Sequence, residues 1–327
     1  FLASLSSSLD NLTSDFNDVV KNAQVSWEEG YKSVPFAARQ MYRVNNVTNK
    51  TSEHSVIDGY GFAERKQEGQ PYAYGSIKQG YTLNLSQQRI GLMDAVTFEM
   101  RQYDKYGEID RKMRKMGETT AKRIELDLTH QFTFGMSAAS YTNRNGETVD
   151  TISADGQNIF DTDHTITGGS DVYSNLITTA FGRTGLEEAE NQFNTFVDNN
   201  GNAVLIEPDT IITGRNVTIQ NAVKEFMKSV LIPDMANNAN NVYSGKYKHL
   251  VLPFLSTNTT GQPVTTYDNY WMLASLKDTS AICEISENPN FKAPSAGGNG
   301  EDFETDDWKF KSAASYDYGV LDFKWII

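Results

Sequence analysis

The chain has 327 residues, 39% of them hydrophobic and 22% charged, which is the composition of an ordinary globular protein with room for about two domains. The 29 basic and 42 acidic residues give a net charge of −13, which weighs against broad nucleic-acid binding, because affinity for phosphates needs a surplus of Lys and Arg. No stretch approaches the roughly 18 consecutive apolar residues of a membrane span, and the common catalytic and nucleotide-binding motifs are missing. We therefore expect a structural or binding protein without catalytic residues, cofactor, metal or membrane contact.

The first 37 residues predict an N-terminal arm. They are rich in Ser, Asn and Asp, and their apolar residues recur at a spacing typical of a loose amphipathic helix. A short terminal helix has no core of its own, so we expect it to stay mobile or to dock on another surface, such as a neighbouring chain. The apolar positions are Leu2, Leu5, Leu9, Leu12, Phe16, Val19 and Val20.

Residues 38–90 predict a long β-hairpin. The returning strand alternates Tyr81, Leu83 and Leu85 with polar residues, and the outgoing strand runs from about Met41 to Ile57. A two-stranded ribbon is marginal in water, so its glycine-punctuated tip indicates a partner surface; the alternative is a hairpin folded back on its own domain. The expected inter-subunit contacts at the tip are Phe62, Glu64, Arg65, Lys66, Tyr72 and Tyr74.

The strongest helix signal spans about residues 104–135, with Gly135 as the stop and Gly117 as a point of weakness. Its charged residues form a stripe that is more often solvated than bound to DNA: Arg111, Lys112, Arg114, Lys115, Lys122 and Arg123. Its apolar residues recur every three to four positions and predict the face that packs on the core: Ile109, Met113, Met116, Ile124, Leu128 and Phe132.

The chain after residue 140 predicts loops up to about residue 180 and then alternating helices and strands. Thr184 and Glu187 have the spacing of a capping box, and the runs 203–206 and 210–213 are typical of strands. A further helix follows, with Val230 as its last apolar position. This alternation predicts a compact α/β unit over about 180–285. The lone Cys283 is expected to be a buried thiol, and the alternating residues at the end of the chain predict a strand that ties the C-terminus into a sheet.

In this order, the elements resemble the tailed-phage major capsid fold named after the phage Hong Kong 97, which is an α+β fold. The resemblance implies five segments: an N-arm at 1–37, an extended E-loop hairpin at 38–90, a P-domain with the spine helix at 91–180, an α/β A-domain at 181–285, and returning P-domain strands at 286–327. The Mu-like major head subunit branch is the more similar one, on the motifs at 156–164, 174–176, 198–202, 207–212 and 316–322.

The resemblance implies a structural major capsid protein that assembles through hexamers and pentamers into an icosahedral phage head. The head would enclose double-stranded DNA without sequence-specific binding. Portal, scaffold or decoration proteins are the expected partners besides other copies of the chain. The expected location is the virion, after assembly in the cytoplasm of the host bacterium.

Three other interpretations remain open at this point. An encapsulin-type cellular nanocompartment shares the fold but packs protein cargo. A metal-dependent hydrolase could use the loop Asp161-Thr162-Asp163-His164, although consecutive loop residues seldom converge on one ion, and hydrogen bonds that lock the loop are the simpler role. A secreted surface-layer protein is compatible with the Asn-x-Ser/Thr sequences at Asn46, Asn216 and Asn258.

Overall fold

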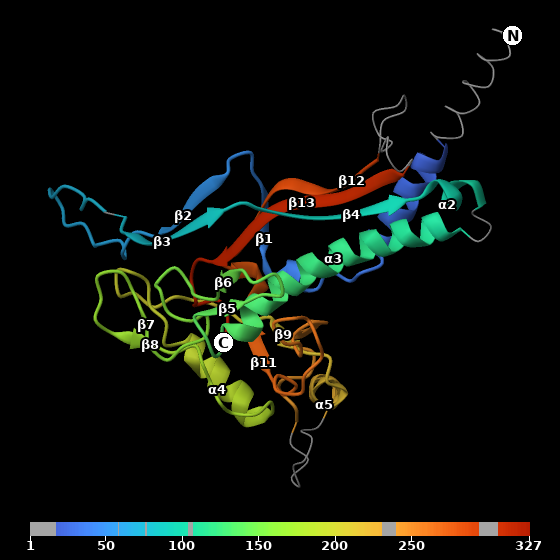
Figure 1. Ribbon diagram of the computed structural model, residues 1–327. Helices are drawn as coiled ribbons and strands as arrows, with labels where there is room; N and C mark the ends of the chain where they lie inside the picture. The colour runs from blue at the N-terminus through green and yellow to red at the C-terminus, as the bar shows by residue number, and fades with distance from the viewer. Residues whose placement is uncertain (1–17, 58, 76, 104–106, 231–239, 294–306) are drawn as a thin grey trace, which may run out of the picture.

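The computed structural model describes residues 18–57, 59–75, 77–103, 107–230, 240–293 and 307–327 (Figure 1). A four-stranded sheet of order β1-β12-β13-β4 lies above a three-stranded sheet of order β10-β9-β11 in this view, and the long helix α3 runs beside the larger sheet. The fold is therefore a mixture of helices and strands, and the expected α+β class is confirmed. No helix in the described ranges is long and apolar enough to cross a membrane.

The long helix α3 (Glu108–Phe134) begins after Gly107 and ends at Gly135, as the sequence predicts to within a few residues; positions 104–106 lie outside the described residues. All the side chains of its predicted core face are buried. A Cβ on Gly117 would lie 2.1 Å from the carbonyl oxygen of Trp27, so this glycine permits a close helix contact rather than a bend.

The partner of α3 in that contact is a helix at residues 18–32, here called the N-terminal helix. Its Trp27 is buried, and the Trp27 indole donates to the Ser312 hydroxyl at 3.1 Å. The predicted arm is therefore not free from residue 18 onward: it docks on its own chain, because Gly30 and Gly117 let the two backbones approach closely enough to bury the tryptophan. Residues 1–17 of the predicted arm lie outside the described residues.

The larger sheet is built on two long antiparallel strands, β12 (Ala281–Lys292) and β13 (Trp308–Val320). Strand β4 (Gln88–Val96) pairs antiparallel with β13, and β1 (Arg43–Asn46) pairs parallel with β12. The short helix α2 (Phe98–Tyr103) follows β4 and precedes α3. Cys283 is buried in β12, as predicted.

The hairpin consists of β2 (Thr51–Ile57) and β3 (Gln79–Ser86), and it extends away from the body on the left of Figure 1. The prediction of one outgoing strand from Met41 to Ile57 is wrong. The chain divides there into the 3-10 turn η1 (Ala38–Met41), then β1 in the body, and only then β2 in the hairpin. The sequence hides this division because the exposed edge strand β1 has no alternation of buried and exposed residues.

The α/β unit has β9 (Thr210–Thr213) at its centre, between the parallel β10 (Lys248–Val251) and the antiparallel β11 (Trp271–Ala274). Helices α4 (Arg183–Phe193) and α5 (Val217–Lys228) share a buried apolar cluster with this sheet. Short elements complete the chain: β5 (Ser140–Thr142), β6 (Thr148–Asp150), β7 (His164–Thr165), β8 (Val172–Tyr173) and η2 (Leu276–Asp278).

Three details of the α/β unit differ from the sequence predictions. Helix α4 begins at Arg183 with Gly182 as its N-cap, so Thr184 lies inside the helix and forms no capping box; Glu187 pairs with Arg183 instead. The run 203–206 is not a strand apart from a single bridge at Ala203. Helix α5 ends at Lys228, which leaves Val230 beyond it and exposed.

The C-terminus is tied into the smaller sheet, as predicted, but the expected strand at the last residues is wrong: β13 ends at Val320, and beyond it Ile326 forms a single bridge to Ala274. Leu273 of β11 and Ile327 exchange backbone hydrogen bonds of 2.8 and 2.9 Å. Trp325 is buried and packs edge-on against Phe132 of α3, with 5.9 Å between ring centroids. The last residues therefore connect the α/β unit to the long helix.

Candidate functional site

The hairpin tip, residues 59–75, carries a group of strongly exposed aromatic residues. The rings of Phe62, Tyr72 and Tyr74 have relative exposures of 80%, 75% and 103%. Glu64, Arg65 and Lys66 are also exposed, and the Lys66 ammonium lies 4.4 Å from the centre of the Tyr72 ring. The structure thus brings together every tip residue named from the sequence on one projecting loop. Exposed aromatic rings beside charged groups are typical of protein-binding surfaces.

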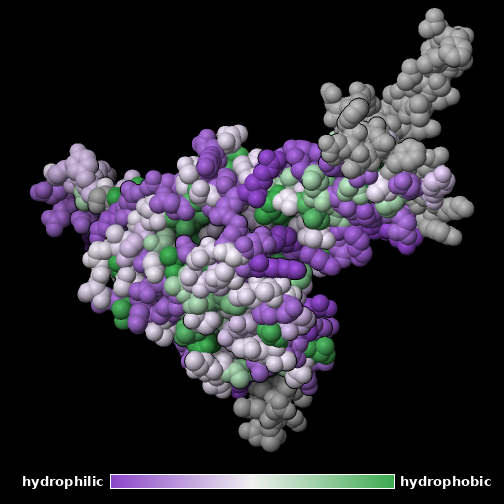
Figure 2. Space-filling view, viewed as in Figure 1, coloured by the Kyte–Doolittle hydropathy of each residue, from purple (hydrophilic) through white to green (hydrophobic). Residues whose placement is uncertain are grey.

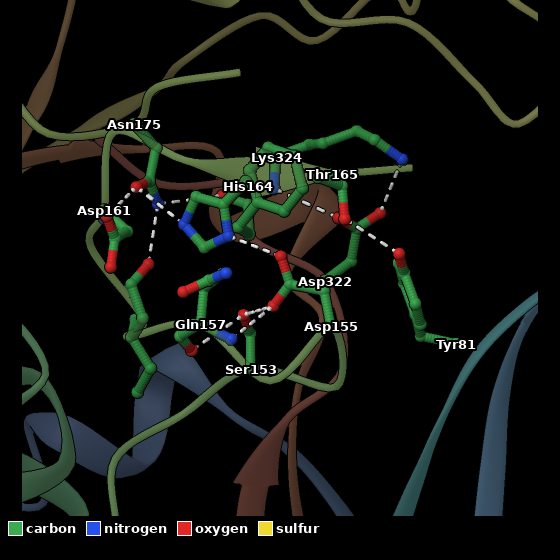
Figure 3. A network of polar contacts seen from close by, with 12 residues as sticks. Tyr81, Ser153, Asp155, Gln157, Asp161, His164, Thr165, Asn175, Asp322 and Lys324 are labelled. Atoms are coloured by element: carbon green, nitrogen blue, oxygen red, sulfur yellow. Dashed lines mark hydrogen bonds and ion pairs between the residues drawn. The ribbon is translucent and has the colours of Figure 1, made fainter. Parts of the chain in front are cut away.

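The loop that suggested a metal site is organised around His164 (Figure 3). The His164 ring is fully buried and stacks on Phe323 with 4.0 Å between ring centroids. Its Nδ1 lies 2.7 Å from the Asp155 carboxylate, and its Nε2 lies 3.0 Å from the side-chain oxygen of Asn175. Both ring nitrogens are therefore engaged, and neither is directed toward Asp161 or Asp163.

The two other carboxylates of the predicted metal loop have structural surroundings. Asp161 accepts a 2.7 Å hydrogen bond from the backbone of Thr162, and Asp163 is exposed. Within the described ranges, no group of three or more His, Cys, Asp or Glu side chains is placed to hold a metal ion. The geometry gives the metal interpretation no support, and the loop is held by side-chain-to-backbone hydrogen bonds instead.

Sequence reasoning missed the two residues that hold His164. Asp155 and Asn175 are nine and eleven positions away, and no motif with these spacings signals a pair. Burial alone would raise the pKa of Asp155, but hydrogen bonds from His164 and Ser153 hold that pKa below its usual value. Asn175 is fully buried, and its amide nitrogen donates toward the carbonyl oxygens of Ile159, Phe323 and Ile326 at 2.7, 3.5 and 3.3 Å. This network joins the loop to the C-terminal segment.

The remaining histidines also have protein partners. His54 Nε2 lies 2.7 Å from Glu284, and His249 Nε2 lies 2.8 Å from the Thr213 hydroxyl. His130 is buried in α3 with its Nε2 2.8 Å from the Thr257 hydroxyl. Burial is the main cause that lowers the pKa of His130 to about 4, and the charge of Arg123 lowers it further.

The neutral state of His130 predicts a loss of stability in mild acid. The unfolded chain takes up a proton at this position below pH 6.5, whereas the folded chain resists protonation down to about pH 4. Stability should therefore fall as the pH drops through this window, by up to about 3 kcal/mol. Denaturant unfolding at pH 7, 5.5 and 4 measures the slope, and His130→Gln, which keeps a donor near Thr257, should flatten it. The same slope in wild type and variant would contradict this assignment.

Each cation of the basic stripe of α3 forms an ion pair within the chain. Figure 2 shows a largely hydrophilic band along this helix. Carboxylates from three places pair with the stripe: Glu118 lies between Lys115 and Lys122, Glu29 of the N-terminal helix pairs with Arg114, and Asp94 of β4 pairs with Lys112. Hydrogen bonds from Lys115 and Lys122 hold the pKa of Glu118 at about 2. Arg111 and Arg123 pair within α3. The stripe is a surface of ion pairs rather than a patch of positive charge.

Comparison with known proteins identifies a family whose model matches most of the chain. Residues 80–327 match the model of a family described as phage capsid protein. No curated protein sequence matches the chain. Among solved structures, the capsid of the cyanophage P-SCSP1u has a TM-score of 0.51 at 12% identity, covering 88% of this chain and 85% of that one. Gordonia phage Cozz gives 0.50 at 10% identity, with 89% and 84% covered, and Microbacterium phage Oxtober96 gives 0.41 at 13%, with 88% and 86% covered.

Proposed function

The chain belongs to the phage capsid protein family, and we propose that it acts through contacts between its own copies, without enzymatic activity. It is a structural major capsid protein, and its copies form an icosahedral shell. Its fold is that of phage capsid subunits, which the similarity to the cyanophage P-SCSP1u and Gordonia phage Cozz structures supports at identities too low to carry any finer detail.

The observation that carries the proposed mechanism is the projecting hairpin. Leu85 is the one buried residue of its two strands, and its tip presents four aromatic residues to solvent, since Tyr60 is also exposed. Large apolar rings gain the most free energy when they are buried. A surface on an adjacent subunit would bury them. Each hairpin then adds one modest contact, and a closed shell multiplies that contact over all its subunits, so stability comes from multivalency. Hexamers and pentamers of the chain would be the repeating units.

The charges of the chain support a shell that encloses DNA without gripping it. The net charge is −13, and the most basic helix, α3, carries its cations in ion pairs. Phosphate binding would have to break these pairs before it could release counterions. Location in the virion follows from the family, and we propose assembly in the host cytoplasm with portal, scaffold or decoration proteins. We also propose that the chain is a member of the Mu-like branch, on the sequence motifs named above.

Electron microscopy of the purified protein, with analytical ultracentrifugation, tests this function. The protein should be prepared alone and together with the other structural proteins of its particle. We expect closed icosahedral particles or ring-shaped capsomers, and the particle diameter then limits the possible lattices. A persistent monomer or dimer in both preparations would overturn the proposal.

A further inference from the structure

The hairpin meets the body of the protein through two carboxylates on adjacent strands. Glu284 of β12 has a relative exposure of 2%, and its two oxygens face the hydroxyl of Ser52 and Nε2 of His54, both on β2. Asp317 of β13 accepts a 2.6 Å hydrogen bond from the backbone nitrogen of Ser86, at the end of β3. Each hairpin strand is thus held by one carboxylate of the larger sheet.

These carboxylates are directly opposite each other in the register of β12 and β13. Like charges at opposed positions repel, so each carboxylate depends on the donors that reach it from the hairpin. Burial raises the pKa of Asp317, the backbone donors Ser86 and Tyr318 lower it again, and the charge of Glu284 raises it. The hairpin donors and the carboxylates therefore stabilise each other.

Apolar packing contributes little to the position of the hairpin. Within the fully described strands β2 and β3, Leu85 is the one buried residue. It lies with Leu83 over Gly319, where a Cβ would come within 3.1 Å of the Leu83 side chain. A two-stranded element with so little buried surface is not fixed in orientation by packing, so polar contacts must set its direction.

A second set of polar contacts holds the hairpin on the side of the α/β unit. The Tyr81 hydroxyl lies 2.8 Å from the Thr165 hydroxyl, a contact drawn in Figure 3. The Lys78 ammonium donates to the carbonyl oxygen of Asn199 at 3.1 Å, and the Asn200 amide donates to the carbonyl oxygen of Gly59 at 3.0 Å. Single side chains therefore hold the hairpin from a second side, at β3, at Lys78 and at the first residue of the tip.

The connection between hairpin and body contains an unsatisfied group. Gln87 separates β3 from β4, and both polar atoms of its side-chain amide are buried with no hydrogen-bond partner in the described part of the chain. Its side chain therefore adds no hydrogen bond that would hold the hairpin at its present angle. A second angle that frees or pairs Gln87 would offset the loss of contacts elsewhere.

We propose that Glu284 and Asp317 are the positioning residues of a hinge that fixes the angle of the hairpin, with Gln87 at its pivot. This inference rests on the proposed function, since the angle decides where the tip meets an adjacent copy. Because one subunit must fit hexamers and pentamers, an angle held by a few polar contacts lets the same sequence serve both environments.

Distance measurement by pulsed electron resonance on the unassembled subunit tests the hinge. Spin labels at Glu53→Cys on the hairpin and Lys115→Cys on α3 report the angle, and the buried native Cys283 is replaced by Ala if it reacts. We expect the double variant Glu284→Gln/Asp317→Asn to broaden and shift the distance distribution, because a neutral acceptor holds its donors less tightly than a carboxylate does. The hairpin-side variant Ser52→Ala/His54→Ala should act in the same direction without substituting any residue of the larger sheet.

The matched control is Glu287→Gln, a carboxylate of the same strand β12 whose partners Arg89 and Lys292 lie outside the hairpin strands. It should leave the distribution unchanged, and circular dichroism checks that every variant is folded. The hinge would be overturned if Glu284→Gln/Asp317→Asn and Ser52→Ala/His54→Ala both gave the distance distribution of the wild type. Because the measurement uses unassembled subunits, it is independent of whether particles form. Failure of the wild type to assemble would count against the proposed function and leave the hinge result standing.

Discussion

Deletion of residues 60–74 is expected to abolish the formation of stable shells while leaving a folded subunit. The removed segment has no helix or strand, and its aromatic rings are exposed, so the subunit loses little buried surface. The deletion joins Gly59 to Gly75, and two adjacent glycines can close a hairpin between β2 and β3. Every subunit of a shell would lose the same contact, so a modest loss per subunit becomes a large loss for the particle.

Microscopy and sedimentation of the deletion variant measure this effect, and thermal unfolding checks the fold. A replacement of residues 60–74 by a Gly/Ser segment of equal length separates the role of the side chains from that of the loop length. The triple variant Phe62→Ala/Tyr72→Ala/Tyr74→Ala should weaken assembly in the same direction. Normal particles formed by the deletion variant would show that the tip is not an essential contact.

Asn175→Ala is expected to cause the largest loss of stability from a single side chain. The Asn175 amide nitrogen donates toward three carbonyl oxygens, and its oxygen accepts from the backbone nitrogen of Asp161 at 2.9 Å and lies 3.0 Å from Nε2 of His164. Removing a fully buried amide leaves several of these groups without partners, at about 1–3 kcal/mol for each one that water cannot reach. We expect a total loss of about 3–5 kcal/mol, because the loop and the C-terminal segment can relax only in part.

Urea unfolding of the subunit measures the change in free energy. The matched control is Asn194→Ala at the end of α4, where an exposed amide makes one 3.2 Å hydrogen bond to the Glu190 carbonyl oxygen. Its effect should stay within about 0.5 kcal/mol. If Asn175→Ala costs less than about 1 kcal/mol, the network in Figure 3 does not hold the C-terminus as we infer.

The sequence by itself determined the elements whose pattern repeats along the chain. The spacing from Ile109 to Phe132 fixes α3, because a helix that buries one face must place apolar residues every three to four positions. The hairpin tip could be recognised from its glycines and aromatic residues, although its role as a contact remains a prediction. The alternation near the end of the chain also predicted a strand tied to a sheet, but β13 ends at Val320, and the last residues reach the smaller sheet through backbone hydrogen bonds and a single bridge at Ile326.

Only the tertiary structure decided which distant residues meet. The docking of the N-terminal helix depends on Gly30 and Gly117, which look like weak points in separate helices until their backbones are placed together. Glu284 and Asp317 become neighbours through the register of β12 and β13, and Asn175 reaches both His164 and the C-terminus through the packing of loops. Such contacts produce no periodic pattern in the sequence. A buried polar residue depends on a partner that is close in space, and that partner can lie anywhere along the chain.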